Sequence, residues 1–312
     1  MDFSAHAAHW IRLIVIAGCL LVMSGCGSQP SSSQDAPARI TDTAYLTADQ
    51  WSDGQAEVAF YRVQRSRDQY GQARDQEFLA GTYLVKHAFD PGGMSKTTEP
   101  EQGVPSFKYA LFYEFESGSY QYKRNYVINA RQRDLRPYKR SLTSFDWCSN
   151  QYSELAVHED GTVDFLMRSD DYGNQQRQFD YAANAHLPTA LPLLVRGLDF
   201  GEQPTQAFDV LLEDGTRVPA QAERVGADSV EVADTPVPAE AIRITYDRRV
   251  PSIIAEETDM AETYWRGTGP ERHLLKVRGA TGRYTMTLVE QLRSPYWNEN
   301  LWPQLERVRQ RP

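Results

Sequence analysis

Cysteine is the residue type in this chain best suited to covalent chemistry, and it occurs at Cys19, Cys26 and Cys148. Cys148 follows Asp146 and Trp147 at the end of a predicted strand. A thiolate is favoured by a neighbouring cation or histidine and disfavoured by a neighbouring carboxylate. Strand alternation puts Asp146 on the same face as Cys148, and no histidine is close in sequence. We therefore predict a partly buried, unreactive Cys148 and a core position for Trp147.

An acidic run at Glu256, Glu257, Asp259 and Glu262 is the second group capable of chemistry. Two carboxylates held close together can act as general acid and base. A run of this kind at a strand end is more often a solvated face, which is the interpretation we prefer.

The remaining motif evidence argues against catalysis and against a cofactor. Gly-x-Ser-x-Gly, a phosphate-binding loop and a dinucleotide loop are all absent from the sequence. Histidines beyond the N-terminal segment are scattered, at His87, His158, His186 and His273. We predict no catalytic residues, no metal ligands and no cofactor.

An apolar stretch at residues 14–26 ends in Met23-Ser24-Gly25-Cys26 and follows Arg12. A positive end, a short apolar run and small residues form a secretory signal peptide. The four residues resemble the bacterial lipobox, in which the cysteine is lipidated and the chain is cut before it. The resemblance implies lipidation at Cys26.

Two further observations concern this anchor. Residues 16–19 also fit a lipobox ending at Cys19, but cleavage there would leave the apolar residues 20–23 directly after the anchor. Cys26 is instead followed by a Ser/Gly-rich stretch, which is typical of a flexible tether. Gly27, rather than Asp, follows Cys26, which favours the periplasmic face of the outer membrane in a bacterium with two membranes.

Composition limits the remaining function classes. The chain has 312 residues, 41% of them hydrophobic, and a net charge of −9. Nucleic-acid binding requires clustered lysine and arginine, so an acidic body argues against that partner. Contact with a membrane is expected through the N-terminal lipid alone.

Strand patterns dominate the body of the chain. Aromatic residues alternate strictly over residues 106–115, and a second alternating segment follows Gly118, which predicts a hairpin. About a dozen strands are expected in all, with one at 252–257 and a tight turn at Asp160-Gly161. We predict a mainly β fold, an antiparallel curved sheet or open barrel with a few short helices.

The predicted domain organisation follows from these segments. Residues 1–25 form the signal peptide, 26–39 the tether and 40–302 a β-rich domain, with a C-terminal tail at 303–312. A leucine- and proline-containing stretch at 182–206 suggests a connector between two lobes of the β-rich domain.

Three stretches together resemble a family of uncharacterised bacterial lipoproteins. These stretches are residues 51–58, Asp146-Trp147-Cys148 and residues 293–301, the last containing Tyr296 and Trp297. Some members of that family carry the label septum formation inhibitor Maf, although the Ser-Pro-Arg-Arg start of true Maf enzymes is absent here. The resemblance supplies no catalytic residues, and Trp51, Asp146, Trp147, Cys148, Tyr296 and Trp297 are our candidate structural or binding residues.

A broader likeness is to the lipoprotein-localisation carriers and receptors, whose curved sheet holds acyl chains under a helical lid. Residues 187–195 are the candidate lid. We therefore expect a lipid-anchored envelope protein that is not an enzyme and that binds an apolar ligand or a partner protein. The alternatives are an envelope hydrolase with an unrecognised site and a structural lipoprotein that links membrane and cell wall.

Overall fold

The computed structural model describes residues 40–69, 72–255 and 257–310. The predicted signal peptide, the lipidation site at Cys26 and the whole of the predicted tether lie outside these residues. Within the described ranges, no helix has the length and apolar character that crossing a membrane requires.

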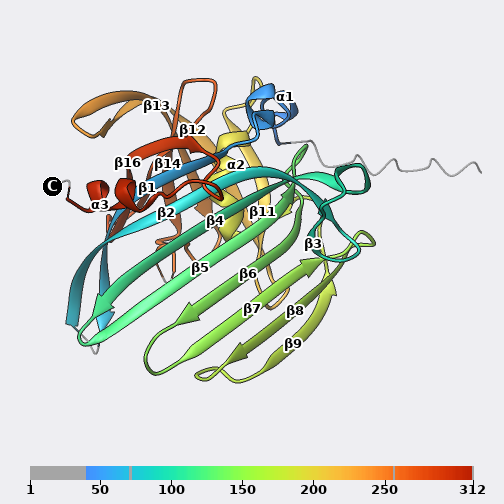
Figure 1. The fold of residues 1–312 in the computed structure, drawn as a ribbon, viewed down its shortest axis with the longest axis horizontal. Coiled ribbons are helices and arrows are strands. Elements are labelled where there is room, and N and C mark those ends of the chain that lie inside the picture. Colours follow the sequence, from blue (N-terminus) through green and yellow to red (C-terminus); the bar gives the residue numbers. More distant parts are fainter. Residues whose placement is uncertain (1–39, 70–71, 256, 311–312) are drawn as a thin grey trace, which may run out of the picture. The chain divides into compact units, whose positions relative to one another are not determined.

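All strands of the described chain belong to a single sixteen-stranded sheet (Figure 1). Its hydrogen-bonded order is β10-β11-β12-β13-β14-β15-β16-β1-β2-β4-β5-β6-β7-β8-β9, and β3 pairs with β2 beside this path. Only β10 and β11 pair in parallel among the registered strands; the other pairs are antiparallel. The predicted mainly β, antiparallel class is confirmed.

The strands are β1 (Ala56–Gln69), β2 (Gln72–Asp90), β3 (Ser95–Lys96), β4 (Val104–Ser117), β5 (Tyr120–Arg131), β6 (Pro137–Phe145), β7 (Asn150–Val157), β8 (Thr162–Ser169), β9 (Gln175–Asp180), β10 (Ala185–His186), β11 (Thr205–Leu211), β12 (Arg217–Val232), β13 (Thr235–Tyr246), β14 (Ala261–Gly267), β15 (Leu274–Gly279) and β16 (Tyr284–Ser294).

The aromatic alternation over residues 106–115 correctly predicts β4 and its hairpin with β5, which closes at Ser117↔Tyr120. The strand expected at 252–257 is absent from the described part of that segment. Thr258 donates its backbone N–H to the Val250 carbonyl at 2.8 Å, and Val250 donates to the Thr258 hydroxyl at 3.1 Å. These two bonds close a loop, and the strand itself begins later, at Ala261 in β14.

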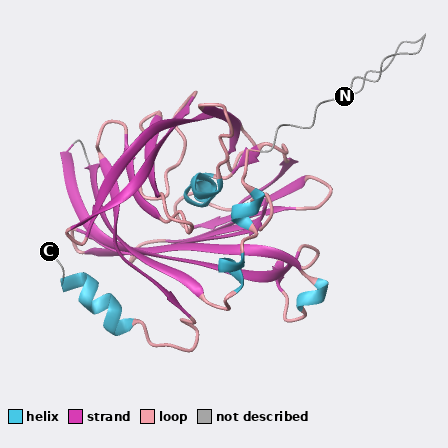
Figure 2. Cartoon of the chain, turned by 90° about the horizontal axis from the view of Figure 1, so that it is seen from above, coloured by secondary structure: helices cyan, strands magenta, loops and turns pink. Residues whose placement is uncertain are grey.

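Two short helical segments precede β1, namely α1 (Thr43–Leu46) and η1 (Asp49–Ser52). Between the strands lie η2 (Pro100–Gln102) and η3 (Pro188–Ala190), the second of which leads into α2 (Leu191–Gly197). Every residue of α2 is buried, and Figure 2 shows a helix enclosed by the curved sheet. Strands before and after residues 182–206 belong to one sheet, so this segment crosses the interior of a single sheet. The candidate lid at 187–195 is part of the core.

Arg196 fastens α2 to the sheet. Its guanidinium donates to both carboxylate oxygens of Glu57 in β1, at 2.7 and 2.8 Å, and both side chains are buried. His273 lies 3.2 Å from the same carboxylate. Burial by itself raises the pKa of Glu57, but Arg196 and His273 outweigh it and lower the pKa to about 2.

The far ends of the strand order meet near the turn between β11 and β12. Arg140 in β6 forms an ion pair with Glu213 of that turn. A Cβ atom on Gly215 would lie 2.8 Å from the Phe179 ring of β9, so only glycine allows this approach. The curved sheet is therefore held nearly closed around α2.

The chain ends on the outer side of the sheet. Residues 303–310, expected as a tail, belong to α3 (Trp302–Gln310). Val308 is fully buried against Ala56, Val58 and Phe60, which are outward-facing residues of β1. The end of the chain thus covers apolar residues that would otherwise face solvent.

Candidate functional site

The predicted Asp146-Trp147-Cys148 site is a surface turn between β6 and β7. Asp146 Oδ1 accepts hydrogen bonds from the backbone N–H groups of Cys148 and Ser149, at 2.7 and 2.9 Å. Trp147 is 69% exposed and meets Tyr120 edge to face at 6.1 Å, and Cys148 is exposed. The predicted burial of both residues is wrong, because β6 ends at Phe145 and the alternation stops there.

Trp51, Tyr296 and Trp297 come together although they are distant in sequence. All three line a cavity of about 600 Å³, which Lys86 and Lys108 also line. Trp51 is buried in the wall, where its indole N–H donates to the Tyr45 carbonyl at 3.0 Å. Trp297 is 52% exposed at the mouth. The turn at residues 146–148 does not line this cavity.

The acidic run divides between two environments. Glu257 is exposed and lies 3.5 Å from Arg249, as a solvated face predicts. Glu262 is 2% exposed, so the predicted solvated position is wrong for that residue. It belongs to β14, whose alternation turns every second side chain inward.

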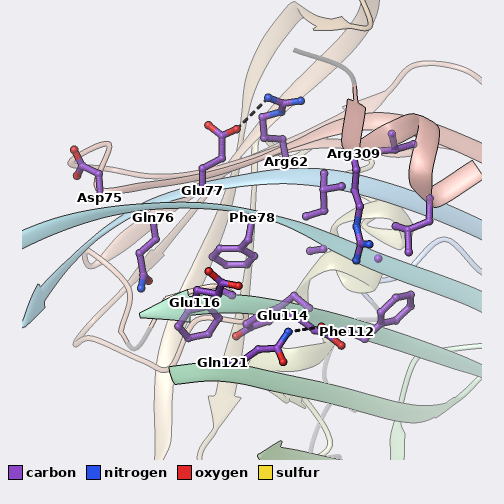
Figure 3. Close-up of a pocket in the computed structure, with 17 residues that line it drawn as sticks. Arg62, Asp75, Gln76, Glu77, Phe78, Phe112, Glu114, Glu116, Gln121 and Arg309 are labelled. Carbon is purple, nitrogen blue, oxygen red and sulfur yellow. Dashed lines mark hydrogen bonds and ion pairs between the residues drawn. The ribbon is translucent and has the colours of Figure 1, made fainter. Parts of the chain in front are cut away.

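A cavity of about 850 Å³ opens where β2 and β4 separate (Figure 3). The two strands pair from Phe89↔Val104 as far as Ala80↔Tyr113. Beyond that point residues 75–79 of β2 have register partners on β1, and residues 114–116 of β4 have partners on β5. Among the described strands, nothing pairs with the two edges that face each other. We call this opening the β2–β4 fissure.

Aromatic residues form the walls of the fissure. Phe78 and Phe115 line it from the inner face of the sheet, with ring centroids 5.4 Å apart. Phe112 lies on the outer face across Gly81, where a Cβ atom would overlap the Phe112 ring. Leu305 and Val308 of α3 complete the apolar lining.

Carboxylates rim the outer face of the fissure at Asp75, Glu77, Glu114 and Glu116. Arg62 lies 3.0 Å from Glu77, and Gln121 donates to Glu114 at 3.2 Å, both drawn as dashed lines in Figure 3. Asp75 and Glu116 have no ion-pair partner within residues 40–69, 72–255 and 257–310. Arg309 also lines the cavity, and Lys123 lies 3.1 Å from Glu114. Four carboxylates therefore face two lining arginines, so the rim is acidic on balance, and the walls are aromatic.

The motif search missed the fissure, although a signal for it is visible in the sequence. Asp75 and Glu77, and again Glu114 and Glu116, repeat with the period of two that places both members of a pair on one face of a strand. Only the sheet topology brings the two pairs together. In the described part of the chain, no cluster of His, Cys, Asp or Glu is arranged to hold a metal ion.

Comparison with known proteins yields fold similarity alone. A scan against protein-family models and a search of curated proteins each found no match. The chain is similar in structure to a β-barrel-like protein of the domain of unknown function DUF1849 from Brucella abortus, at a TM-score of 0.46 and 8% identity over 76% of this chain and 97% of that one. It is also similar to a DUF1329 family protein from Desulfovibrio piger, at a TM-score of 0.22 and 10% identity over 80% and 74% of the two chains.

Proposed function

We propose that this chain is a lipid-anchored, non-enzymatic protein of the bacterial envelope that binds an extended segment of a partner protein in the β2–β4 fissure. The Met23-Ser24-Gly25-Cys26 motif and the tether after it support the anchor, and Gly27 supports the outer membrane. The resemblance to uncharacterised bacterial lipoproteins supports the same placement.

The observation that carries the proposal is the separation of β2 from β4. Each strand presents a backbone edge to the fissure over residues 75–79 and 114–116. Unpaired strand edges are templates for the addition of another strand. A cavity of about 850 Å³ also falls within the size range of ligand sites, about 300–1,000 Å³.

The two faces of the fissure define the chemistry of the partner. Successive side chains of an added strand point to opposite faces. Those on the outer face would meet the carboxylate rim, and those on the inner face would meet Phe78 and Phe115. The expected partner segment therefore alternates basic and apolar residues.

A calorimetric titration of the full chain with a short peptide of alternating lysine and valine tests this. We expect saturable binding, and no binding by the same peptide with glutamate in place of lysine. Methylation of alternate backbone nitrogens on the peptide removes hydrogen-bond donors, and we expect it to abolish binding.

Site-directed variants locate the interaction. The double variant Glu114→Gln/Glu116→Gln should bind the lysine-containing peptide about tenfold more weakly or worse, because charge-assisted hydrogen bonds are lost. Glu223→Gln with Glu231→Gln removes two exposed carboxylates of β12 and should leave affinity unchanged. Equal effects of the two pairs, or undiminished binding of the methylated peptide, would exclude strand addition in the fissure.

Binding of an apolar ligand is the second candidate, and the cavity lined by Trp51, Tyr296 and Trp297 favours it. A fluorescent fatty acid should then quench tryptophan emission, and Trp297→Ala should reduce that quenching. Quenching that survives Trp297→Ala unchanged would remove this candidate.

A further inference from the structure

A second cavity, of about 760 Å³, gathers arginine side chains of distant segments in a chain with a net charge of −9. Five arginines line it, against two carboxylates among the described lining residues, Glu257 and Asp259. The arginines come from β1, β5, the loop after β13 and the residue before β16: Arg65, Arg67, Arg124, Arg249 and Arg283.

The surroundings hold the guanidinium of Arg65 in place and bury part of the guanidinium of Arg124. Arg65 donates to the Ile254 carbonyl at 2.9 Å and to Gln76 at 2.8 Å, and it stacks 4.3 Å above the Phe115 ring. The Nε–H of Arg124 is buried and has no acceptor among the described residues. Buried donors normally have an acceptor, so Arg124 is a guanidinium whose hydrogen bonds are incomplete within the described residues.

Behind the cavity wall lies the buried carboxylate of Glu262. Tyr246 and Tyr264 donate to one of its oxygens, each at 2.8 Å. Tyr284 and Ser252 donate to the other oxygen, at 2.8 and 3.1 Å. Four donors occupy the acceptor sites of one carboxylate, which fixes the direction of each hydroxyl.

Ser252 and Tyr284, which carry two of these hydroxyl groups, are also among the residues that line the cavity. A hydroxyl has one hydrogen and two lone pairs. Since each hydrogen is directed to Glu262, these oxygens can act toward a ligand only as acceptors. The Ser252 oxygen also accepts from the backbone N–H of Ile254 at 3.5 Å, which leaves it one further lone pair. Burial raises the pKa of Tyr284, so its phenol stays protonated and keeps this arrangement at neutral pH.

We infer that this cavity binds a phosphate ester that also carries free hydroxyl groups. The arginines supply charge-assisted donors for the phosphate oxygens, and arginine suits that geometry. Ser252 and Tyr284 accept hydrogen bonds from the hydroxyl groups of the ligand. A phospholipid headgroup and a soluble sugar or glycerol phosphate share this chemistry.

Calorimetric titration of the full chain in nonionic detergent tests the inference with glycerol 1-phosphate. We expect saturable binding, with inorganic phosphate about tenfold weaker because it lacks the hydroxyl groups. Adding phosphatidylglycerol or phosphatidylcholine to the micelles distinguishes the two sources. Competition by phosphatidylglycerol alone identifies a headgroup site, and competition by neither lipid identifies a soluble ligand.

Three variants separate the roles of the residues, with a thermal melt to verify that each is folded. Arg124→Gln should weaken the binding of both glycerol 1-phosphate and inorganic phosphate at least tenfold, which is about the effect of one lost charge-assisted hydrogen bond. Ser252→Ala should weaken the binding of glycerol 1-phosphate and leave the binding of inorganic phosphate unchanged. Arg243→Gln, on the exposed face of β13, should change neither affinity.

Two results would overturn the inference. One is the absence of saturable binding of glycerol 1-phosphate. The other is an Arg243→Gln effect equal to that of Arg124→Gln, which would indicate general attraction of anions. Neither result bears on the peptide titrations of the β2–β4 fissure, because the cavity lined by the five arginines and the fissure are lined by different residues.

Discussion

The exposure of Trp147 changes what a substitution there should do. A buried tryptophan replaced by alanine costs about 3–5 kcal/mol, which would apply if Trp147 were in the core. With 69% of its surface exposed, Trp147→Ala should change the free energy of unfolding by about 0.5 kcal/mol or less. Urea denaturation measures this, and a loss above about 2 kcal/mol would contradict the exposed position.

His186 makes the stability of the fold sensitive to mild acid. Its Nδ1 atom is buried without a partner among the described residues, and burial lowers its pKa to about 4. The unfolded chain therefore binds the proton more tightly than the folded one between about pH 6.5 and pH 4. Stability is retained above pH 6.5 and falls as the pH drops through that window.

Replacing His186 tests this pH dependence. The difference between the pKa values of His186 in the unfolded and the folded chain corresponds to a loss of roughly 3 kcal/mol in the free energy of unfolding once the pH has fallen through the whole window. His186→Phe should reduce the loss of stability between pH 7 and pH 4, measured by urea unfolding at each pH. His158→Phe, which alters a half-buried histidine 2.8 Å from Asp164, serves as the control and should change the slope much less than His186→Phe does.

At the scale of elements, the position of α2 depends on the pair formed by Glu57 and Arg196. Breaking one partner of a buried ion pair leaves an uncompensated charge and costs about 3–5 kcal/mol. Arg196→Met should therefore lower the unfolding free energy by that amount in urea denaturation. Replacing both partners with apolar residues should restore much of the loss.

The surface pair of Arg309 and Glu306 provides the comparison. Exposed pairs contribute about 0–1 kcal/mol, so Arg309→Met should have little effect. If Arg196→Met were equally mild, α2 would be held by apolar packing alone, through residues such as Leu193 and Leu194.

At the scale of the whole molecule, the lipid anchor proposed at Cys26 would decide where the β body operates. Cys26→Ser should abolish fatty-acid labelling and leave a soluble body or an uncleaved precursor. The unaltered chain should stay with membranes at high salt, because acyl chains hold it by apolar burial rather than by charge. Labelling that persists in Cys26→Ser would reject lipidation at this residue.

Placement in the outer membrane is the proposal made from Gly27. Density-gradient fractionation should recover the unaltered chain with outer-membrane markers, and Gly27→Asp provides the matched variant. Recovery of the unaltered chain with inner-membrane markers would contradict this placement.

Local patterns in the sequence determined the class of the fold, because strand periodicity depends on neighbouring residues. The alternating aromatics of β4 must lie on one face wherever that strand pairs, so the hairpin with β5 follows from sequence. The period of two also placed the carboxylates of the fissure rim on one face of their strands. Where a strand ends is decided less locally, which is why Trp147 was predicted in the core.

Only the tertiary structure decided what meets across the sheet. Glu57 and Arg196 are 139 residues apart, and Tyr246 and Tyr284 reach Glu262 from two other strands, so no spacing rule connects these groups. The fissure arises because β2 and β4 keep their outer partners, β1 and β5, after they lose each other. Long-range pairing depends on topology and packing, which local periodicity does not encode.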